Sequence, residues 1–156
     1  MSLPSPAPKL SAPDGRAAAA PAPAARPVIP HLAACGFPSP AEDHYGACDE
    51  LDLNQRCIAN PVATYFVQAD AGVSMVEFGI FPGDTLVVDR SITARNGDIV
   101  LALYDGGFLV KQWHVQGGRL QLRSGHPDHA PIQIGPEEEV EVWGVVTWSF
   151  RKQYRR

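Results

Sequence analysis

Short β-branched and aromatic runs, separated by turn-forming residues, fill the chain from Thr64 onward. Runs of this kind are typical of β-strands, and their close spacing favours an all-β domain. Ile99 to Leu103 is apolar without alternation, so we expect this run to be buried on both faces. We predict strands near 64–69, 85–89, 98–104, 108–115, 119–123 and 140–149.

Glycine-containing turns separate several of these predicted strands. Each turn supplies Gly, Asn or Asp, which accept the backbone conformations that tight turns require. The regular spacing of these turns supports the all-β interpretation. The turns are Pro82-Gly83-Asp84, Asn96-Gly97-Asp98, Asp105-Gly106-Gly107 and Gln116-Gly117-Gly118.

The beginning of the chain has a different composition. Eight of the first 30 residues are proline and nine are alanine, and such a segment can neither build a core nor hold a helix together. We therefore expect a disordered or extended N-terminal arm, followed by a more mixed segment in which Leu51 to Ile58 forms a short helix or strand. The predicted organisation is an arm over 1–35, an extended tether over 36–60 and a β-rich domain over 61–156.

Charge and cysteine content exclude several functional classes. A net charge of −4 disfavours direct, sequence-specific DNA binding, which normally needs a basic surface. The three cysteines fit neither a disulfide framework nor a zinc site, so a reducing, cytoplasmic location is expected, without cofactor or metal. No run approaches the roughly 20 apolar residues of a membrane span. The lipoprotein-like box Leu32-Ala33-Ala34-Cys35 follows a proline-rich stretch rather than an apolar one.

Lys111 is the first candidate for chemistry. Alternation along 108–115 places it on the same strand face as Leu109, Trp113 and Val115. Burial disfavours the ammonium form, and a pKa lowered from about 10.4 to about 8 would raise the neutral fraction at pH 7 from about 0.04% to about 10%. Two interpretations stay open: a catalytic base, or an edge-strand lysine whose ammonium reaches water. Periodicity alone favours the second.

Ser74 is the second candidate, within Gly72-Val73-Ser74-Met75. A glycine two residues earlier lets a substrate approach the backbone, and nearby amides would form an oxyanion hole. The Gly-x-Ser pattern alone is weak. A triad of Ser74, His114 and Asp98 is disfavoured because His114 should face away from Lys111. The loop His126-Pro127-Asp128-His129 is interpreted as polar surface rather than a metal site.

Several short sequence motifs occur in the same order as in UmuD-type mutagenesis proteins, so the chain resembles this branch of the LexA/UmuD family of self-cleaving serine proteases, peptidase S24. The resemblance covers residues 35 to about 149. The motifs that carry it are Cys35-Gly36-Phe37-Pro38-Ser39-Pro40, Leu51-Asp52-Leu53-Asn54-Gln55, Ala63-Thr64-Tyr65-Phe66-Val67, Ser74-Met75, Gly83-Asp84, Asp89-Arg90-Ser91-Ile92-Thr93-Ala94, Gly97-Asp98-Ile99-Val100, Val110-Lys111 and Gly144-Val145-Val146.

This resemblance implies a LexA/signal-peptidase-like catalytic β-domain in which Ser74 is the nucleophile and Lys111 the general base. The scissile bond would be Cys35–Gly36, so that the chain cuts off its own arm. The resemblance also implies a homodimer, stimulation of cleavage by RecA filaments on single-stranded DNA, and an error-prone Y-family polymerase subunit as partner in the SOS response.

Two positions depart from the pattern of UmuD-type proteins. Val73 stands where they usually carry an acidic residue, and the segment Ala69-Asp70-Ala71-Gly72 has one residue more. The alternative hypothesis is therefore a dimeric module that binds a polymerase or replication partner without cleaving itself. A repressor is disfavoured because residues 1–34 are too proline-rich for a helix-turn-helix, and a signal peptidase because no membrane anchor is evident.

Overall fold

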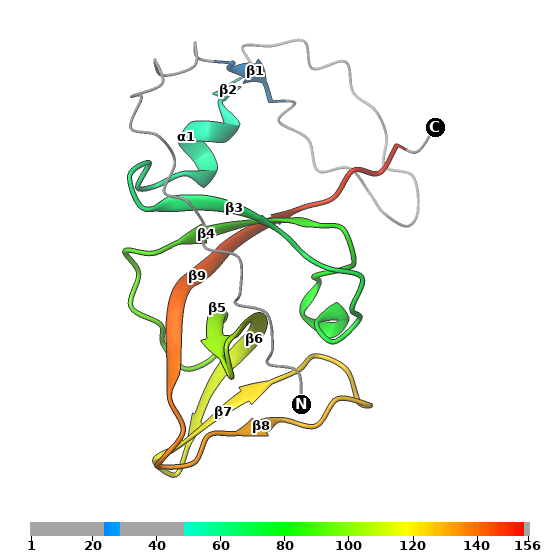
Figure 1. The fold of residues 1–156 in the computed structure, drawn as a ribbon. Coiled ribbons are helices and arrows are strands. Elements are labelled where there is room, and N and C mark those ends of the chain that lie inside the picture. The colour runs from blue at the N-terminus through cyan, green and yellow to red at the C-terminus, as the bar shows by residue number, and fades with distance from the viewer. Residues whose placement is uncertain (1–23, 29–48, 155–156) are drawn as a thin grey trace, which may run out of the picture.

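The structure is a computed structural model that describes residues 24–28 and 49–154. One sheet of seven antiparallel strands dominates it, in the order β3-β4-β9-β5-β6-β7-β8 (Figure 1). The all-β prediction is confirmed. The strands are β3 (Thr64–Gln68), β4 (Thr85–Asp89), β5 (Ile99–Tyr104), β6 (Gly107–Gln116), β7 (Arg119–Arg123), β8 (Ile132–Gln133) and β9 (Val140–Phe150).

Six of these strands coincide with the predicted runs to within one residue at each end. The predicted turns join them, and Gly83, Gly97, Gly106 and Gly117 all have positive φ. The prediction omitted β8, since two residues are too few to form a recognisable run. Local pattern and turn chemistry thus account for most of the sheet.

The longest strand, β9, lies between β4 and β5 and joins the two halves of the sheet. Its pairing is interrupted twice: Val87 and Val88 pair with Trp148 and Val146, and a second shift leaves Trp143 unpaired between Gly144 and Val142. Such bulges bend a strand and increase its twist. Figure 1 accordingly shows β9 curving across the molecule rather than running straight.

Two apolar clusters lie on the sheet. The first contains buried Met75 and Ile80, from the segment between β3 and β4, packed with three strand residues, Leu86, Val88 and Leu101. The second comprises Val100, Ala102 and Val145. Since Val100 and Leu101 are neighbours on β5, alternation assigns the clusters to opposite faces, as expected for the unalternating run at Ile99 to Leu103.

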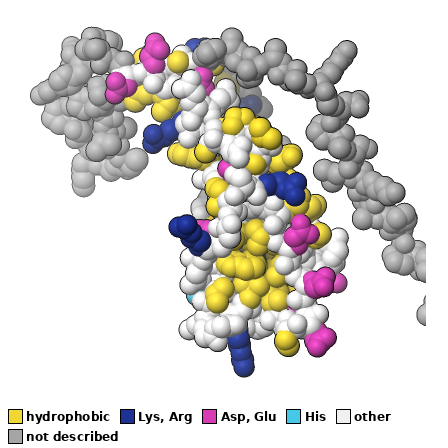
Figure 2. Space-filling model, turned by 90° about the vertical axis from the view of Figure 1, so that its left-hand side faces the viewer, with side chains coloured by type: hydrophobic (Ala, Val, Ile, Leu, Met, Phe, Trp, Pro, Cys, Tyr) yellow, Lys and Arg dark blue, Asp and Glu magenta, His cyan; other side chains and the backbone are white. Residues whose placement is uncertain are grey.

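No helix layer covers the sheet in the described part of the chain. The α-helix there, α1 (Leu53–Cys57), has five residues and lies near one end of the molecule. Figure 2 shows hydrophobic side chains gathered on one face of the protein, with charged groups beside them. No helix within residues 24–28 and 49–154 has the length and apolarity to cross a membrane.

A small second sheet joins the two described pieces. It pairs β1 (Arg26–Pro27) with β2 (Glu50–Leu51), and the Val28 amide donates to the Asp49 carbonyl over 2.7 Å. Asp52 caps α1 through a hydrogen bond from the Asn54 amide and also accepts one from the Ala24 amide. Val28 and Asp49 therefore lie side by side.

The predicted short element at Leu51 to Ile58 is confirmed as part of β2 and α1. The predicted cleavage bond, Cys35–Gly36, and all of the arm except residues 24–28 lie outside the described residues. The proposed boundaries at 35 and 60 remain predictions.

Candidate active site

Ser74 and Lys111 meet in space although 37 positions separate them. The Lys111 ammonium donates a hydrogen bond to the Ser74 hydroxyl, with Nζ and Oγ 2.7 Å apart. Lys111 projects from β6, whereas Ser74 lies in the turn between β3 and the 3-10 helix η1 (Val76–Phe78). A serine and a lysine at this distance have the geometry of a nucleophile and its base.

The turn that carries Ser74 is anchored by the residues that follow it. Met75 is 5% exposed and Ile80 is 6% exposed, and both belong to the first apolar cluster. Their backbones are joined by a hydrogen bond from the Ile80 amide to the Met75 carbonyl. Gly79, with φ of 79°, ends η1 in a left-handed conformation that returns the chain toward the core.

A cleft of about 250 Å³ opens beside the two side chains. Its walls come from the end of β3, the nucleophile turn and β6, and they are largely apolar. A cleft next to a nucleophile that combines apolar walls with a few polar groups is typical of a substrate site. The lining residues are Val67, Gln68, Ala69, Asp70, Gly72, Ser74, Met75, Ile80, Leu101, Phe108, Leu109, Val110 and Lys111.

Two opposing effects act on the Lys111 side chain. Desolvation by burial lowers its pKa, because the ammonium loses water, and the negative charge of Asp70 opposes this by favouring the ammonium. The net pKa of Lys111 is lowered from its ordinary value. Strand β6 lies between β5 and β7, so the interpretation of Lys111 as an edge-strand lysine is wrong about the strand, while its side chain is partly exposed.

Asp70 also organises the backbone ahead of the nucleophile. Its Oδ1 accepts a hydrogen bond from the Gly72 amide at 2.8 Å, which closes a local turn. Within the described residues, the amides of Val73, Ser74 and Met75 donate no hydrogen bond to another group. The turn that holds Ser74 thus presents donors next to the hydroxyl.

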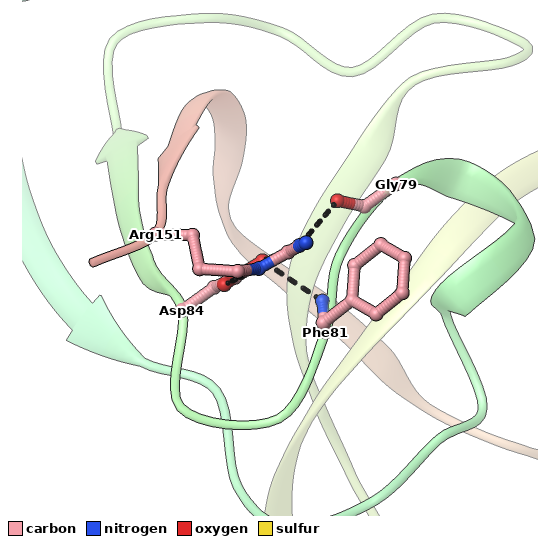
Figure 3. A network of polar contacts seen from close by, with 4 residues as sticks. All are labelled: Gly79, Phe81, Asp84 and Arg151. Carbon is pink, nitrogen blue, oxygen red and sulfur yellow. Dashed lines mark hydrogen bonds and ion pairs between the residues drawn. The ribbon is translucent and has the colours of Figure 1, made fainter. Parts of the chain in front are cut away.

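The far end of the nucleophile segment is held by an ion pair (Figure 3). Arg151, just after β9, donates from Nε and one terminal nitrogen to the two carboxylate oxygens of Asp84, both at 2.7 Å. It also donates to the Gly79 carbonyl, and its guanidinium lies 3.7 Å from the centre of the Phe81 ring. The Phe81 amide donates to the same carboxylate at 2.9 Å.

This pair shifts both ionisation equilibria. Asp84 is 1% exposed, and the hydrogen bonds from Arg151 outweigh its desolvation, so its pKa is lowered. The same contact raises the pKa of Arg151. Arg151 is the first of several cationic residues after β9, and it pairs with a buried carboxylate.

The other constellations suggested by the sequence are not assembled. In the described part of the chain no hydrogen bond joins Ser74 to His114 or Asp98, and the Asp98 carboxylate instead accepts from the Arg95 amide. The His126 and His129 rings make an edge-to-face contact, with their centroids 5.3 Å apart. No group of three or more metal-ligating side chains occurs among residues 24–28 and 49–154.

Comparison with known proteins agrees with this geometry. The sequence model described as Peptidase S24-like matches residues 27–147. The chain belongs to the peptidase S24-like family. It is 44% identical over 128 residues to Protein ImpA of Salmonella typhimurium, covering 78% of this chain and 81% of that protein. It is 44% identical over 115 residues to Protein MucA of Escherichia coli, covering 73% and 76%.

The LexA repressor of Magnetococcus marinus is a more distant relative, 35% identical over 121 residues, which cover 77% of this chain and 49% of that protein. The resemblance to the LexA/UmuD family is thereby confirmed. Membership of the S24-like family places the chain among peptidases, and the matched region includes the bond between Cys35 and Gly36.

Sequence reasoning missed three residues that hold this S24 site. Asp70 was named only within the segment that has one residue more. Arg151 was not named as a site residue, and neither was Gly125, whose amide donates to the Ser74 carbonyl at 2.7 Å. Each acts through a contact with a residue distant in sequence or through a turn that periodicity does not describe. A signal was available only for Asp70, because Asp followed two positions later by Gly is a turn pattern.

Proposed function

We propose that this protein is a self-cleaving serine protease in which Ser74 attacks the Cys35–Gly36 bond and Lys111 is the general base. The observation that carries the proposal is the 2.7 Å contact between Lys111 Nζ and Ser74 Oγ, made by a lysine whose pKa burial has lowered. A serine hydroxyl is a weak nucleophile until a neighbouring base removes its proton, and a desolvated lysine supplies such a base.

The reaction proceeds in two steps. Neutral Lys111 takes the proton of the Ser74 hydroxyl as its oxygen attacks the Cys35 carbonyl, and the resulting ammonium returns a proton to the Gly36 amine as it leaves. Water then hydrolyses the acyl-enzyme. The amides of Val73, Ser74 and Met75, which donate to no other group in the described residues, are the candidate donors to the oxyanion of each tetrahedral intermediate.

The location of β1 bears on the fate of the arm. A cut between 35 and 36 separates β1 from β2 in the covalent chain but leaves their hydrogen bonds intact. Two backbone-paired residues, the Val28–Asp49 backbone hydrogen bond and one hydrogen bond to Asp52 are a weak attachment. We therefore expect the arm to leave after cleavage.

We further propose that the shortened chain acts as a homodimer in SOS mutagenesis, with RecA filaments on single-stranded DNA as activator and a Y-family polymerase subunit as partner. Relatedness to ImpA, MucA and a LexA repressor supports this role. The half-exposed aromatic side chains of Phe66, Phe108 and Trp148 leave apolar surface for a partner.

The test uses the purified full-length chain, incubated across a range of alkaline pH values and, separately, at neutral pH with RecA filaments on single-stranded DNA. Mass spectrometry should find a fragment beginning at Gly36. Ser74→Ala and Lys111→Ala should each slow cleavage by at least about a thousandfold, because the two groups act as one unit. Lys152→Ala, which removes an exposed lysine, is the matched control and should cleave like wild type.

Failure to find the Gly36 fragment under either condition would leave the non-cleaving binding module as the better description. Cleavage that survives Lys111→Ala would assign the base to another residue. Cleavage of Ser74→Ala by added wild-type chain would show that one molecule can cut another.

A further inference from the structure

Gly125 lies in the loop after β7 and makes backbone hydrogen bonds to the nucleophile's peptide group and to η1. Its amide donates to the Ser74 carbonyl at 2.7 Å, and its carbonyl accepts from the Glu77 amide at 2.9 Å. The Ser74 carbonyl belongs to the peptide that joins the nucleophile to Met75. These two bonds therefore fix the orientation of that peptide and the start of η1.

The ring of Phe78, at the end of η1, covers Gly125. A Cβ atom built on Gly125 would lie 2.6 Å from Cδ2 of this ring and 3.0 Å from both Cε2 and Cγ. Phe78 is 36% exposed, but real Cβ atoms essentially never show separations under 3.0 Å, so something must shift. Because Cγ is among the three atoms, spinning the ring about its own axis does not relieve the clash. The ring as a whole, or the backbone beneath it, must move.

The backbone conformation of Gly125 does not itself require glycine, since Gly125 is not among the glycines with positive φ. Gly79 is the opposite case: its φ is 79°, and a Cβ there would meet nothing within 4 Å. Glycine is thus needed at position 125 for space alone. This need arises from the Phe78 side chain, so a second substitution that removes the ring should reverse the effect of a side chain at position 125.

We propose that Gly125 and Phe78 together position the nucleophile, Gly125 by holding the Ser74 peptide and Phe78 by closing over the space that the missing side chain leaves. This inference rests on the proposed self-cleavage. A side chain at position 125 would displace Phe78 and η1, and with them the Ser74 carbonyl. The Ser74 hydroxyl would then leave the position in which it meets Lys111. A misplacement of about 1 Å can cost about a hundredfold in rate.

The experiment compares the first-order rate of self-cleavage in full-length wild type, Gly125→Ala, Phe78→Ala and the double variant, each across the alkaline pH range. Gly125→Ala should be slower by about tenfold or more at every pH, because the reacting atoms are misaligned rather than the base altered. Phe78→Ala keeps both backbone hydrogen bonds of Gly125, so its self-cleavage rate should fall less than that of Gly125→Ala. The double variant should return to the rate of Phe78→Ala.

Thermal unfolding separates positioning from stability. Substitutions of residues in contact do not act additively, so removing the Phe78 ring should relieve a loss of stability in Gly125→Ala as well as its loss of rate, and a positioning role requires the slow rate to persist where Gly125→Ala is fully folded. Thermal unfolding of all four proteins shows whether each is folded at the assay temperature. Gly107→Ala is the matched control, since its Cβ would lie 4.0 Å from the nearest atom, the Tyr104 carbonyl oxygen, and its rate should equal that of wild type.

Equal rates for Gly125→Ala and wild type would overturn the inference and leave the proposed function intact. So would a double variant as slow as Gly125→Ala, because the ring would then not be the cause. A wild-type chain that never cleaves, with or without RecA filaments, overturns the proposed function itself and with it any positioning role.

Discussion

The segment from Ser74 to Asp84 is held to the rest of the molecule at both ends, and the two attachments differ in kind. At the Ser74 end, Gly125 contributes two uncharged backbone hydrogen bonds beside the reacting hydroxyl. At the Asp84 end, Arg151 contributes a bidentate ion pair to a buried carboxylate, ten positions from the nucleophile (Figure 3).

The two attachments differ in the kind of contact and in their position relative to Ser74, so we expect them to have different roles. Backbone hydrogen bonds between neutral groups do not titrate, and those at Gly125 fix the peptide that carries Ser74. A buried ion pair depends on pH, and it is costly to break because the remaining charge stays buried. We therefore expect the Gly125 contact to control rate and the Asp84–Arg151 pair to control stability.

The largest expected effect on stability is that of Arg151→Ala. It leaves the Asp84 carboxylate buried with the Phe81 amide as its remaining partner, and the thermal unfolding midpoint should fall by roughly 5 °C. Differential scanning calorimetry measures the change. Lys152→Ala, at the exposed neighbouring position, should leave the midpoint unchanged.

Self-cleavage of Arg151→Ala, assayed well below its unfolding midpoint, should be impaired less than that of Gly125→Ala. A reversed order, with Arg151→Ala the slower enzyme and Gly125→Ala the less stable protein, would contradict the division of roles between the two attachments.

The contribution of the ion pair should also depend on pH. Since the folded-state pKa of Asp84 is lowered from 3.8, the stabilisation is fully present above the unfolded-state pKa and is lost as pH falls through the folded-state pKa. Urea unfolding of wild type and Arg151→Ala should therefore give a difference in stability that is constant near neutral pH and narrows below about pH 4. A difference that stays constant to pH 2 would contradict this assignment.

The sequence predicted those parts of the fold that are encoded locally. Six strands and their turns follow from β-branched runs and from glycines such as Gly97 and Gly106, because alternation and left-handed conformations are properties of neighbouring residues. The pairing of Ser74 with Lys111 was predicted only through the family resemblance, since periodicity alone favoured a solvated lysine.

The attachments of the nucleophile segment could not be predicted in this way. Gly125 and Phe78 are 47 positions apart in the sequence. The need for glycine at position 125 becomes apparent only in the structure, where the Phe78 ring covers it. Arg151 looks like one of several cations in a tail until Asp84 is found beneath it. Both contacts depend on how distant parts of the chain pack, and no periodicity within either segment reports that packing.

Asp70 is a third charged group near the nucleophile segment. Like the Asp84–Arg151 pair it acts through its charge, but it acts on Lys111, the proposed base. Its charge raises the pKa of Lys111 against the larger lowering by burial. Asp70→Asn removes that charge and keeps an oxygen that can accept the Gly72 amide hydrogen bond. The neutral form of Lys111 then becomes more populated at a given pH.

Self-cleavage must rise with pH through the pKa of Lys111, since only the neutral amine accepts the hydroxyl proton. Asp70→Asn should move that rise to lower pH, giving a few-fold faster rate near neutrality and the same rate at the alkaline plateau. Asp105→Asn is the matched control, because it removes one negative charge from a turn where Asp105 already has a φ of 48° that asparagine accepts. A pH profile that stays in place would mean that Asp70 serves the turn alone and that burial by itself lowers the pKa of Lys111. A profile that moves to higher pH would contradict the assigned effect of the Asp70 charge on Lys111.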